Sequence, residues 1–109
     1  MIDVRLFRTE TAWTGFCLDG HADYGGEHDD IICASVSALT LNAANSIEAI
    51  ARDEVISEED DGHLDCRFPK GLSHDGAVLM ESMILGLRMI SEITDDNGEP
   101  FLKVTIEEV

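Results

Sequence analysis

The feature that most constrains the fold is a long run of apolar residues at helical spacing in the middle of the chain. Between Ile31 and about Arg52 an apolar residue recurs every three or four positions, at Ile32, Val36, Leu39, Ala43, Ile47 and Ile50. This periodicity predicts a long amphipathic helix. A second such run predicts a helix that Ser73 caps and that continues to about Thr94, with its apolar face at Leu79, Met83, Leu87 and Ile90.

Segments in which apolar and polar residues alternate surround both helices and predict short strands. They are Ile2–Phe7, Trp13–Asp19, a segment around Val55 and Ile56, His63–Phe68 and Phe101–Ile106. Residues 58–62 read as an acidic turn that joins two of these strands. The predicted order is ββαββαβ, an α/β (α+β) class with a mixed five-stranded sheet and two long helices in a single compact domain over residues 1–109. The order of the strands in the sheet, and whether both helices share one of its faces, stay open.

Charge limits the class of partner. The 109 residues include 23 acidic and seven basic residues, for a formal net charge of −16. Direct nucleic-acid binding is therefore not expected, because it depends on lysine and arginine contacts to phosphate. Such a surface would attract a basic protein, although an acidic excess that only maintains solubility is an equally good interpretation. No segment is apolar over the length of a membrane span, and the N-terminal residues lack the pattern of a secretory signal, so we expect a cytoplasmic protein.

Most of the functional information lies between Gly20 and Ser37, which read G-H-A-D-Y-G-G-E-H-D-D-I-I-C-A-S-V-S. His21 follows a predicted strand, and Cys33 is predicted in the first turn of the long helix, with Asp30 as its N-cap. A thiol at a helix N-terminus is more readily ionised. The intervening loop is long enough to place His21 beside Cys33, which would form the Cys/His pair of thiol catalysis.

The same cysteine has a structural interpretation. Isoleucine, alanine and valine are the sequence neighbours of Cys33, and a cysteine in an apolar segment is more often a small buried apolar residue than a nucleophile. Asp29 and Asp30 would also raise the pKa of a neighbouring thiol unless they point away from it. The residues alone leave both interpretations open. Cys17 and Cys66 complete an odd set of three cysteines at no metal-like spacing, so neither a disulfide framework nor a metal site is predicted.

The motif resembles that of the bacterial ribosomal-processing cysteine proteases, the Prp family. In that family a Gly-His-Ala sequence precedes a loop and then Asp-(Ile/Val)-(Ile/Val)-Cys-Ala-x-(Val/Ile)-Ser. Here the pattern is met by Gly20, His21, Ala22, Asp30, Ile31, Ile32, Cys33, Ala34, Val36 and Ser37. Ser35 stands where a smaller residue is usual.

The resemblance implies a cysteine endopeptidase that removes a short N-terminal extension from a large-subunit ribosomal protein during ribosome assembly. It implies Cys33 as nucleophile, His21 as general base, no cofactor or metal, and a homodimer. Asp30 would cap the helix and help to orient the pair. Ser37, Tyr24, Gly25 and Gly26 would line the peptide groove, and helix-terminal N–H groups would stabilise the oxyanion.

Two other functions remain compatible with the sequence. A non-enzymatic ribosome-associated adaptor would bind a basic ribosomal protein through the acidic surface, with Cys33 structural. A thiol redox or acyl-transfer protein is the weaker alternative, since the chain has no Cys-x-x-Cys pair. Reactivity of the Cys33 thiol separates the protease from the adaptor, because only a protease needs an accessible, readily ionised cysteine.

Overall fold

In the described part of the chain, five strands and two helices follow one another in the predicted order ββαββαβ. The computed structural model describes residues 1–20 and 27–109. The strands are β1 (Ile2–Arg8), β2 (Trp13–Asp19), β3 (Ile56–Asp60), β4 (His63–Arg67) and β5 (Leu102–Glu108). The helices are α1 (Glu27–Ala49) and α2 (His74–Ser91). The predicted fold class is therefore confirmed.

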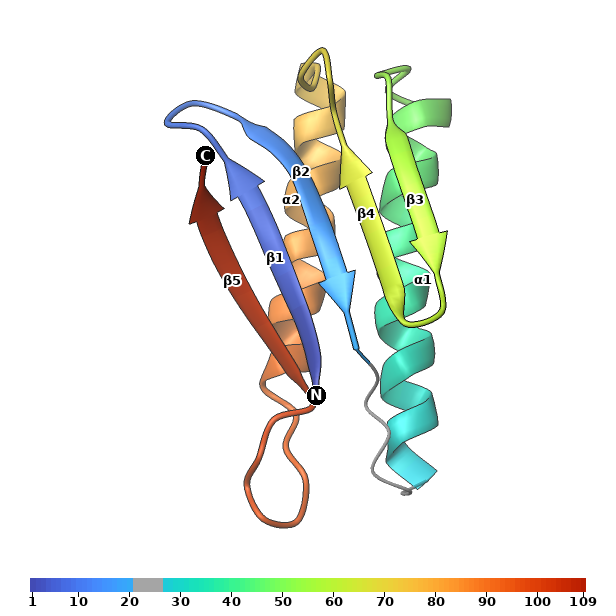
Figure 1. Cartoon of the computed structure of the whole chain (residues 1–109), viewed down its shortest axis with the longest axis vertical. Coiled ribbons are helices and arrows are strands. Elements are labelled where there is room, and N and C mark those ends of the chain that lie inside the picture. The colour runs from blue at the N-terminus through green and yellow to red at the C-terminus, as the bar shows by residue number, and fades with distance from the viewer. Residues whose placement is uncertain (21–26) are drawn as a thin grey trace.

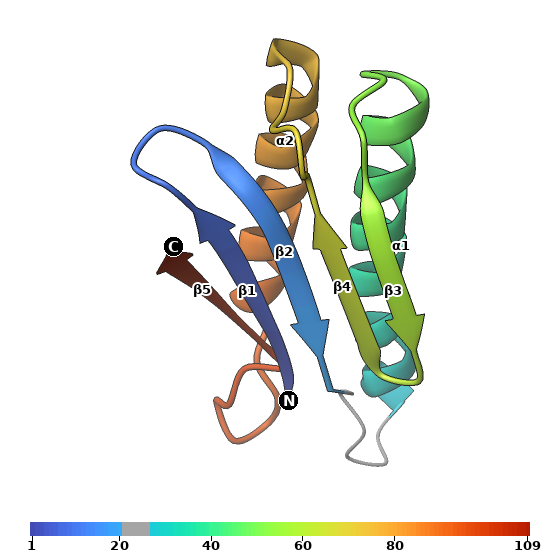
Figure 2. The ribbon, with the colours of Figure 1, turned by 45° about the horizontal axis from the view of Figure 1, so that its top comes forward.

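The strands form one mixed sheet in the order β3-β4-β2-β1-β5. Neighbouring strands are antiparallel except β1 and β5, which run parallel. Both helices lie on the same face of the sheet, as Figures 1 and 2 show from two directions, and no helix of the described residues covers the opposite face. This settles both questions that the sequence left open. Among the described helices, none combines the length and apolar character needed to span a membrane.

The core lies between the sheet and the helices. It follows from the alternation of apolar residues in the strands and from their spacing of three or four positions in the helices. Successive strand residues point to opposite faces, so Ile2, Val4 and Leu6 of β1 are buried against the helices. Val36 and Ile47 of α1 and Met80 and Leu87 of α2 are buried opposite them, among other apolar residues. The predicted apolar face of the first helix is right except at Ile50, which is 67% exposed and lies beyond the end of α1.

Some predicted boundaries were wrong. Helix α1 begins at Glu27 rather than at residue 31, and α2 ends at Ser91, short of Thr94. The cap of α2 is confirmed, because the Ser73 side chain accepts a hydrogen bond from the Gly76 N–H. Both errors follow from helix ends being set by local hydrogen bonding as well as by the apolar repeat.

Strand β3 begins one residue after Val55 and includes Glu58, Glu59 and Asp60, which the sequence predicted to be part of a turn. All five of its residues are exposed. An edge strand with neither face buried has no apolar alternation to reveal it, and pairing with β4 defines it instead. The turn is reduced to Asp61 and Gly62, the hairpin signal that the sequence did contain.

Three parts of the chain meet at one end of the sheet (Figures 1 and 2). They are the end of β2, the β3–β4 turn and the N-terminal part of α1. The Gly20 N–H donates a hydrogen bond of 2.8 Å to the Gly62 carbonyl, which ties the end of β2 to the turn.

Candidate active site

A cavity of about 530 Å³ opens at this end of the sheet. Its walls come from the start of β1, the end of β2, the middle of α1 and the β3–β4 turn. The lining residues are Ile2, Leu18, Gly20, Cys33, Val36, Ser37, Thr40, Leu41, Glu59, Asp60, Asp61, Gly62, His63 and Leu64. The cavity thus brings together Gly20, Cys33 and Ser37 of the sequence motif.

Cys33 is partly buried on α1, where it packs against the hydrophobic core and also lines the cavity. A cysteine in this position is anchored by packing on one side and reachable through the cavity on the other. Such partial exposure is what a reactive cysteine needs and a purely structural one does not.

The predicted position of Cys33 within the helix was wrong. Since α1 begins at Glu27, Cys33 lies in the second turn and Asp30, which is exposed, lies inside the helix rather than at its N-cap. The unbonded N–H groups of a helix belong to its first four residues, here residues 27–30. The helix-terminal N–H groups predicted to stabilise an oxyanion therefore precede Cys33, and the macrodipole acts on its thiol more weakly than predicted.

Ser37 follows Cys33 by one helical turn and lines the same cavity, as its spacing predicts. The hydroxyl of neighbouring Thr40, buried in the helix, donates to the Val36 carbonyl at 2.9 Å. Ser35 points elsewhere, because its hydroxyl donates to the Ile31 carbonyl at 2.7 Å and it does not line the cavity. Of the two serines in the motif, Ser37 is therefore the one that lines the cavity.

Gly20 has a conformation that requires glycine. Its φ of +99° is rarely adopted by other residues, and a Cβ atom there would lie 2.6 Å from the Met1 carbonyl oxygen. The close contact with β1 and the hydrogen bond to Gly62 fix the end of β2, from which the chain continues to His21.

His21, Tyr24, Gly25 and Gly26 lie outside the described residues. Their predicted roles, and the predicted pairing of His21 with Cys33, stay predictions.

Acidic residues line one wall of the cavity. Glu59 and Asp60 end β3, and Asp61 follows in the turn. This wall suits a substrate that carries positive charge near the bond to be cleaved.

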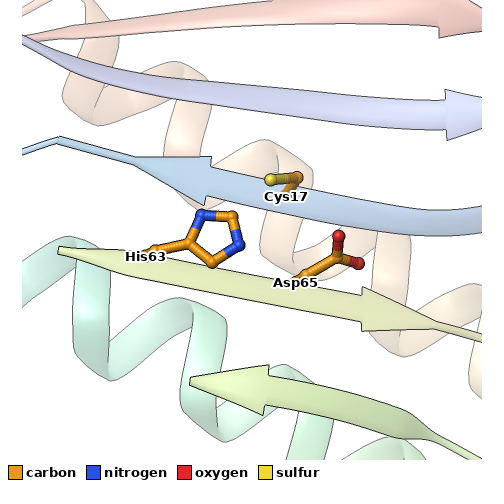
Figure 3. A group of neighbouring side chains, drawn as sticks. All are labelled: Cys17, His63 and Asp65. Atoms are coloured by element: carbon orange, nitrogen blue, oxygen red, sulfur yellow. The ribbon is translucent and has the colours of Figure 1, made fainter. Parts of the chain in front are cut away.

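A second thiol and imidazole lie close together on the other face of the sheet. Cys17 of β2 and His63 of β4 have side-chain ligand atoms within 4.8 Å of each other and of an Asp65 carboxylate oxygen (Figure 3). His63 is half-buried, with its Nδ1 2.5 Å from Asp19 Oδ1. That hydrogen bond raises the pKa of His63 and lowers the pKa of Asp19.

The proximity of Cys17 and His63 fits a Cys/His dyad, but the thiol is poorly suited to attack. Cys17 is only 2% exposed, and burial raises the pKa of its thiol. The Cys17 sulfur also accepts a hydrogen bond from Arg5 at 3.4 Å, and its S–H is directed to Asp19 Oδ2 at 3.6 Å. Cys66 is 0% exposed, and its burial in the core raises the pKa of its thiol to about 12. Cys33 is thus the one cysteine among the three that is not buried.

Comparison with known proteins identifies the family. The family model described as cysteine protease Prp matches residues 1–98. The chain belongs to the Prp family of cysteine proteases. It is 31% identical over 88 residues to the ribosomal processing cysteine protease Prp of Bacillus subtilis, covering 75% of this chain and 79% of the relative. It is 28% identical over 86 residues to the corresponding Staphylococcus aureus protein, covering 77% and 81%.

Solved structures agree with this membership. The crystal structure of the S. aureus Prp protease in complex with a covalently linked product peptide superposes with a TM-score of 0.83 at 25% identity, covering 98% of this chain and 100% of the other. A Streptococcus mutans crystal structure superposes with a TM-score of 0.77 at 26% identity, covering 100% and 96%. The chain is therefore a cysteine protease, as the resemblance implied.

Proposed function

We propose that this protease removes a short N-terminal extension from a large-subunit ribosomal protein during ribosome assembly, with Cys33 as its nucleophile. The observation that carries the proposal is the position of Cys33, which is partly buried on α1 and faces a cavity large enough for several peptide side chains. The names of the Prp relatives support the ribosomal substrate.

In this proposal His21 is the general base. It accepts the proton of the Cys33 thiol, the resulting thiolate attacks the scissile carbonyl carbon, and the imidazole returns the proton to the leaving amine. Water then hydrolyses the thioester, with the same imidazole as base. The fixed conformation of Gly20 supports this role, because the residue before His21 is held against both β1 and the β3–β4 turn.

The remaining residues of the motif position the substrate. Ser37 lies one turn after Cys33 in the cavity, where its hydroxyl would donate to a substrate carbonyl. Tyr24, Gly25 and Gly26 would cover the peptide from the loop. Asp30 is exposed on the first turns of α1 and would act on the pair through its charge, not through a cap. No cofactor enters the mechanism.

We also propose that the enzyme is a cytoplasmic homodimer. None of the three cysteines is in a disulfide bond, as is usual in a reducing compartment. Along α2, Val78, Leu85 and Met89 are 52%, 64% and 64% exposed and share one side of the helix. A second copy would bury this stripe. Light scattering should give the mass of a dimer, and Leu85→Glu should give a monomer, whereas a wild-type monomer would contradict the dimer.

Labelling with iodoacetamide across a pH series, with the modified cysteine identified by mass spectrometry, tests the nucleophile. We expect Cys33 to be labelled fastest, and its labelling below neutral pH to be lost in His21→Ala. Labelling of Cys17 in preference to Cys33 would instead favour the Cys17–His63 pair. No labelling of any cysteine until unfolding would favour the adaptor.

Cleavage of a peptide that contains the ribosomal protein's N-terminal extension tests the reaction itself. Cys33→Ser should abolish cleavage while the circular dichroism spectrum stays that of the wild type. Cys17→Ser serves as the matched control and should retain cleavage. The assignment of Cys33 as nucleophile fails if Cys33→Ser retains cleavage and Cys17→Ser abolishes it.

A further inference from the structure

We propose that Cys17, His63 and Asp65 bind a divalent transition-metal ion, best matched by Zn²⁺, on the face of the sheet opposite the helices. The catalytic proposal uses none of these three side chains. The cluster therefore adds a second site to the chain.

Strand pairing places the three side chains together. Cys17 of β2 lies directly opposite Asp65 of β4 in the antiparallel pair, so the two point to the same face. His63 precedes Asp65 by two residues and therefore shares that face. Figure 3 shows all three on the side away from the helices, with the imidazole ring turned toward the other two.

The donor atoms suit zinc in type and spacing. Thiolate sulfur, imidazole nitrogen and carboxylate oxygen are its usual protein ligands, at bonds of about 2.0–2.3 Å, which place tetrahedral ligands roughly 3.3–3.7 Å apart. The three atoms here lie within 4.8 Å of one another. Small side-chain rotations bring them onto one ion, and a water molecule supplies the fourth ligand.

Asp19 is the hydrogen-bond acceptor that a metal-binding histidine normally has at its other ring nitrogen. Its Oδ1 lies 2.5 Å from His63 Nδ1, so Nδ1–H donates to the carboxylate and Nε2 keeps its lone pair for a metal. The other oxygen of Asp19 already accepts from the Cys17 thiol at 3.6 Å. Binding replaces the S–H bond with an S–metal bond, and the released proton passes to solvent.

Arg5 shows that this cluster attracts a cation. Its Nη2 lies 3.4 Å from the Cys17 sulfur and 3.5 Å from Asp19 Oδ2. Arg5 would compete with a metal ion for these atoms. It can move away from them, because its side chain is 43% exposed and has a second acidic partner, Glu107, at 3.9 Å. Arg67 donates hydrogen bonds to both carboxylate oxygens of Asp65. One of these oxygens would leave Arg67 and bind the metal.

The test uses Co²⁺ as a probe on the untagged full chain after removal of metals with a chelator. Thiolate-bound Co²⁺ gives a near-ultraviolet charge-transfer band, which we expect at one equivalent per chain and which Zn²⁺ should displace. Cys17→Ser should abolish the band. Asp19→Asn should weaken affinity about 10- to 100-fold. Arg5→Gln should strengthen it.

Cys33→Ser is the matched control, because that cysteine lies on α1 behind the sheet, and its band should equal that of the wild type. Absence of a stoichiometric band, its persistence in Cys17→Ser, or its loss in Cys33→Ser would each overturn the proposal. Asp19 is half-exposed, so Asp19→Asn tests the site without disturbing the core, and wild-type affinity there would also count against it.

Discussion

Replacing Gly20 with alanine tests how the end of β2 is held beside the active site. The residue has a φ of +99°, and the new Cβ would lie 2.6 Å from the Met1 carbonyl oxygen. Real Cβ contacts essentially never fall below 3.0 Å, so the backbone of one segment must move. That movement also strains the 2.8 Å hydrogen bond from Gly20 N–H to the Gly62 carbonyl.

The expected loss of stability has two parts. A left-handed conformation costs an alanine about 1–2 kcal/mol. Weakening the Gly20–Gly62 hydrogen bond adds about 0.5–1.5 kcal/mol. Together they lower the free energy of unfolding by about 1.5–3.5 kcal/mol, which moves a urea midpoint by about 1 M or more. We also expect a lower kcat/KM, because the displaced residue leads directly to His21.

Gly71→Ala is the matched control for this measurement. Gly71 also has a positive φ, +77°, but a Cβ there would have no atom within 4 Å. Urea unfolding should therefore show only the conformational part of the loss, about 1–2 kcal/mol, with no change in kcat/KM. If Gly20→Ala proves no more destabilising than Gly71→Ala, the close contact between Gly20 and Met1 does not hold the site, and the reasoning fails.

Two further predictions concern Cys66 and Ser37. Burial raises the pKa of Cys66 from 9.0 to about 12. The unfolded chain therefore loses this proton first as pH rises, and stability falls above pH 9 by about 1.4 kcal/mol per pH unit from this group. The free energy of unfolding, measured with denaturant at several pH values, should fall with pH less steeply in Cys66→Ala by that amount. Equal pH slopes in both proteins would contradict the burial argument. Ser37→Ala should lower kcat/KM about 3- to 10-fold through loss of one substrate hydrogen bond. Ser35→Ala should leave peptide cleavage unchanged, and equal effects of the two serine variants would remove Ser37 from the substrate groove.

The helices and most strands could be predicted from the sequence because their apolar repeats are what drive them into the core. Ile2, Val4 and Leu6 alternate and are buried, and Val36 and Ile47 recur at helical spacing and are buried. Strand β3 has no such repeat, since its position depends on its partner β4. The start of α1 was misplaced for a related reason. Asp30 is a good capping residue, but helical hydrogen bonding begins before it.

The candidate site was predictable only in part. Residue spacing indicated that Cys33 and Ser37 share a helix face, and both line the cavity. The acidic wall could not be predicted, because Glu59 and Asp61 reach the cavity through the order of the strands. The same holds for Cys17 and His63. They are 46 positions apart in the chain, and only the pairing of β2 with β4 brings them together.

The exposure of β3 has a consequence for how copies of the chain behave at high concentration. A bare edge strand presents unpaired N–H and C=O groups to which a strand of another molecule can add. Here that edge carries Glu58, Glu59 and Asp60 in succession. Two such edges would bring six carboxylates together, and their mutual repulsion opposes the first step of fibril growth.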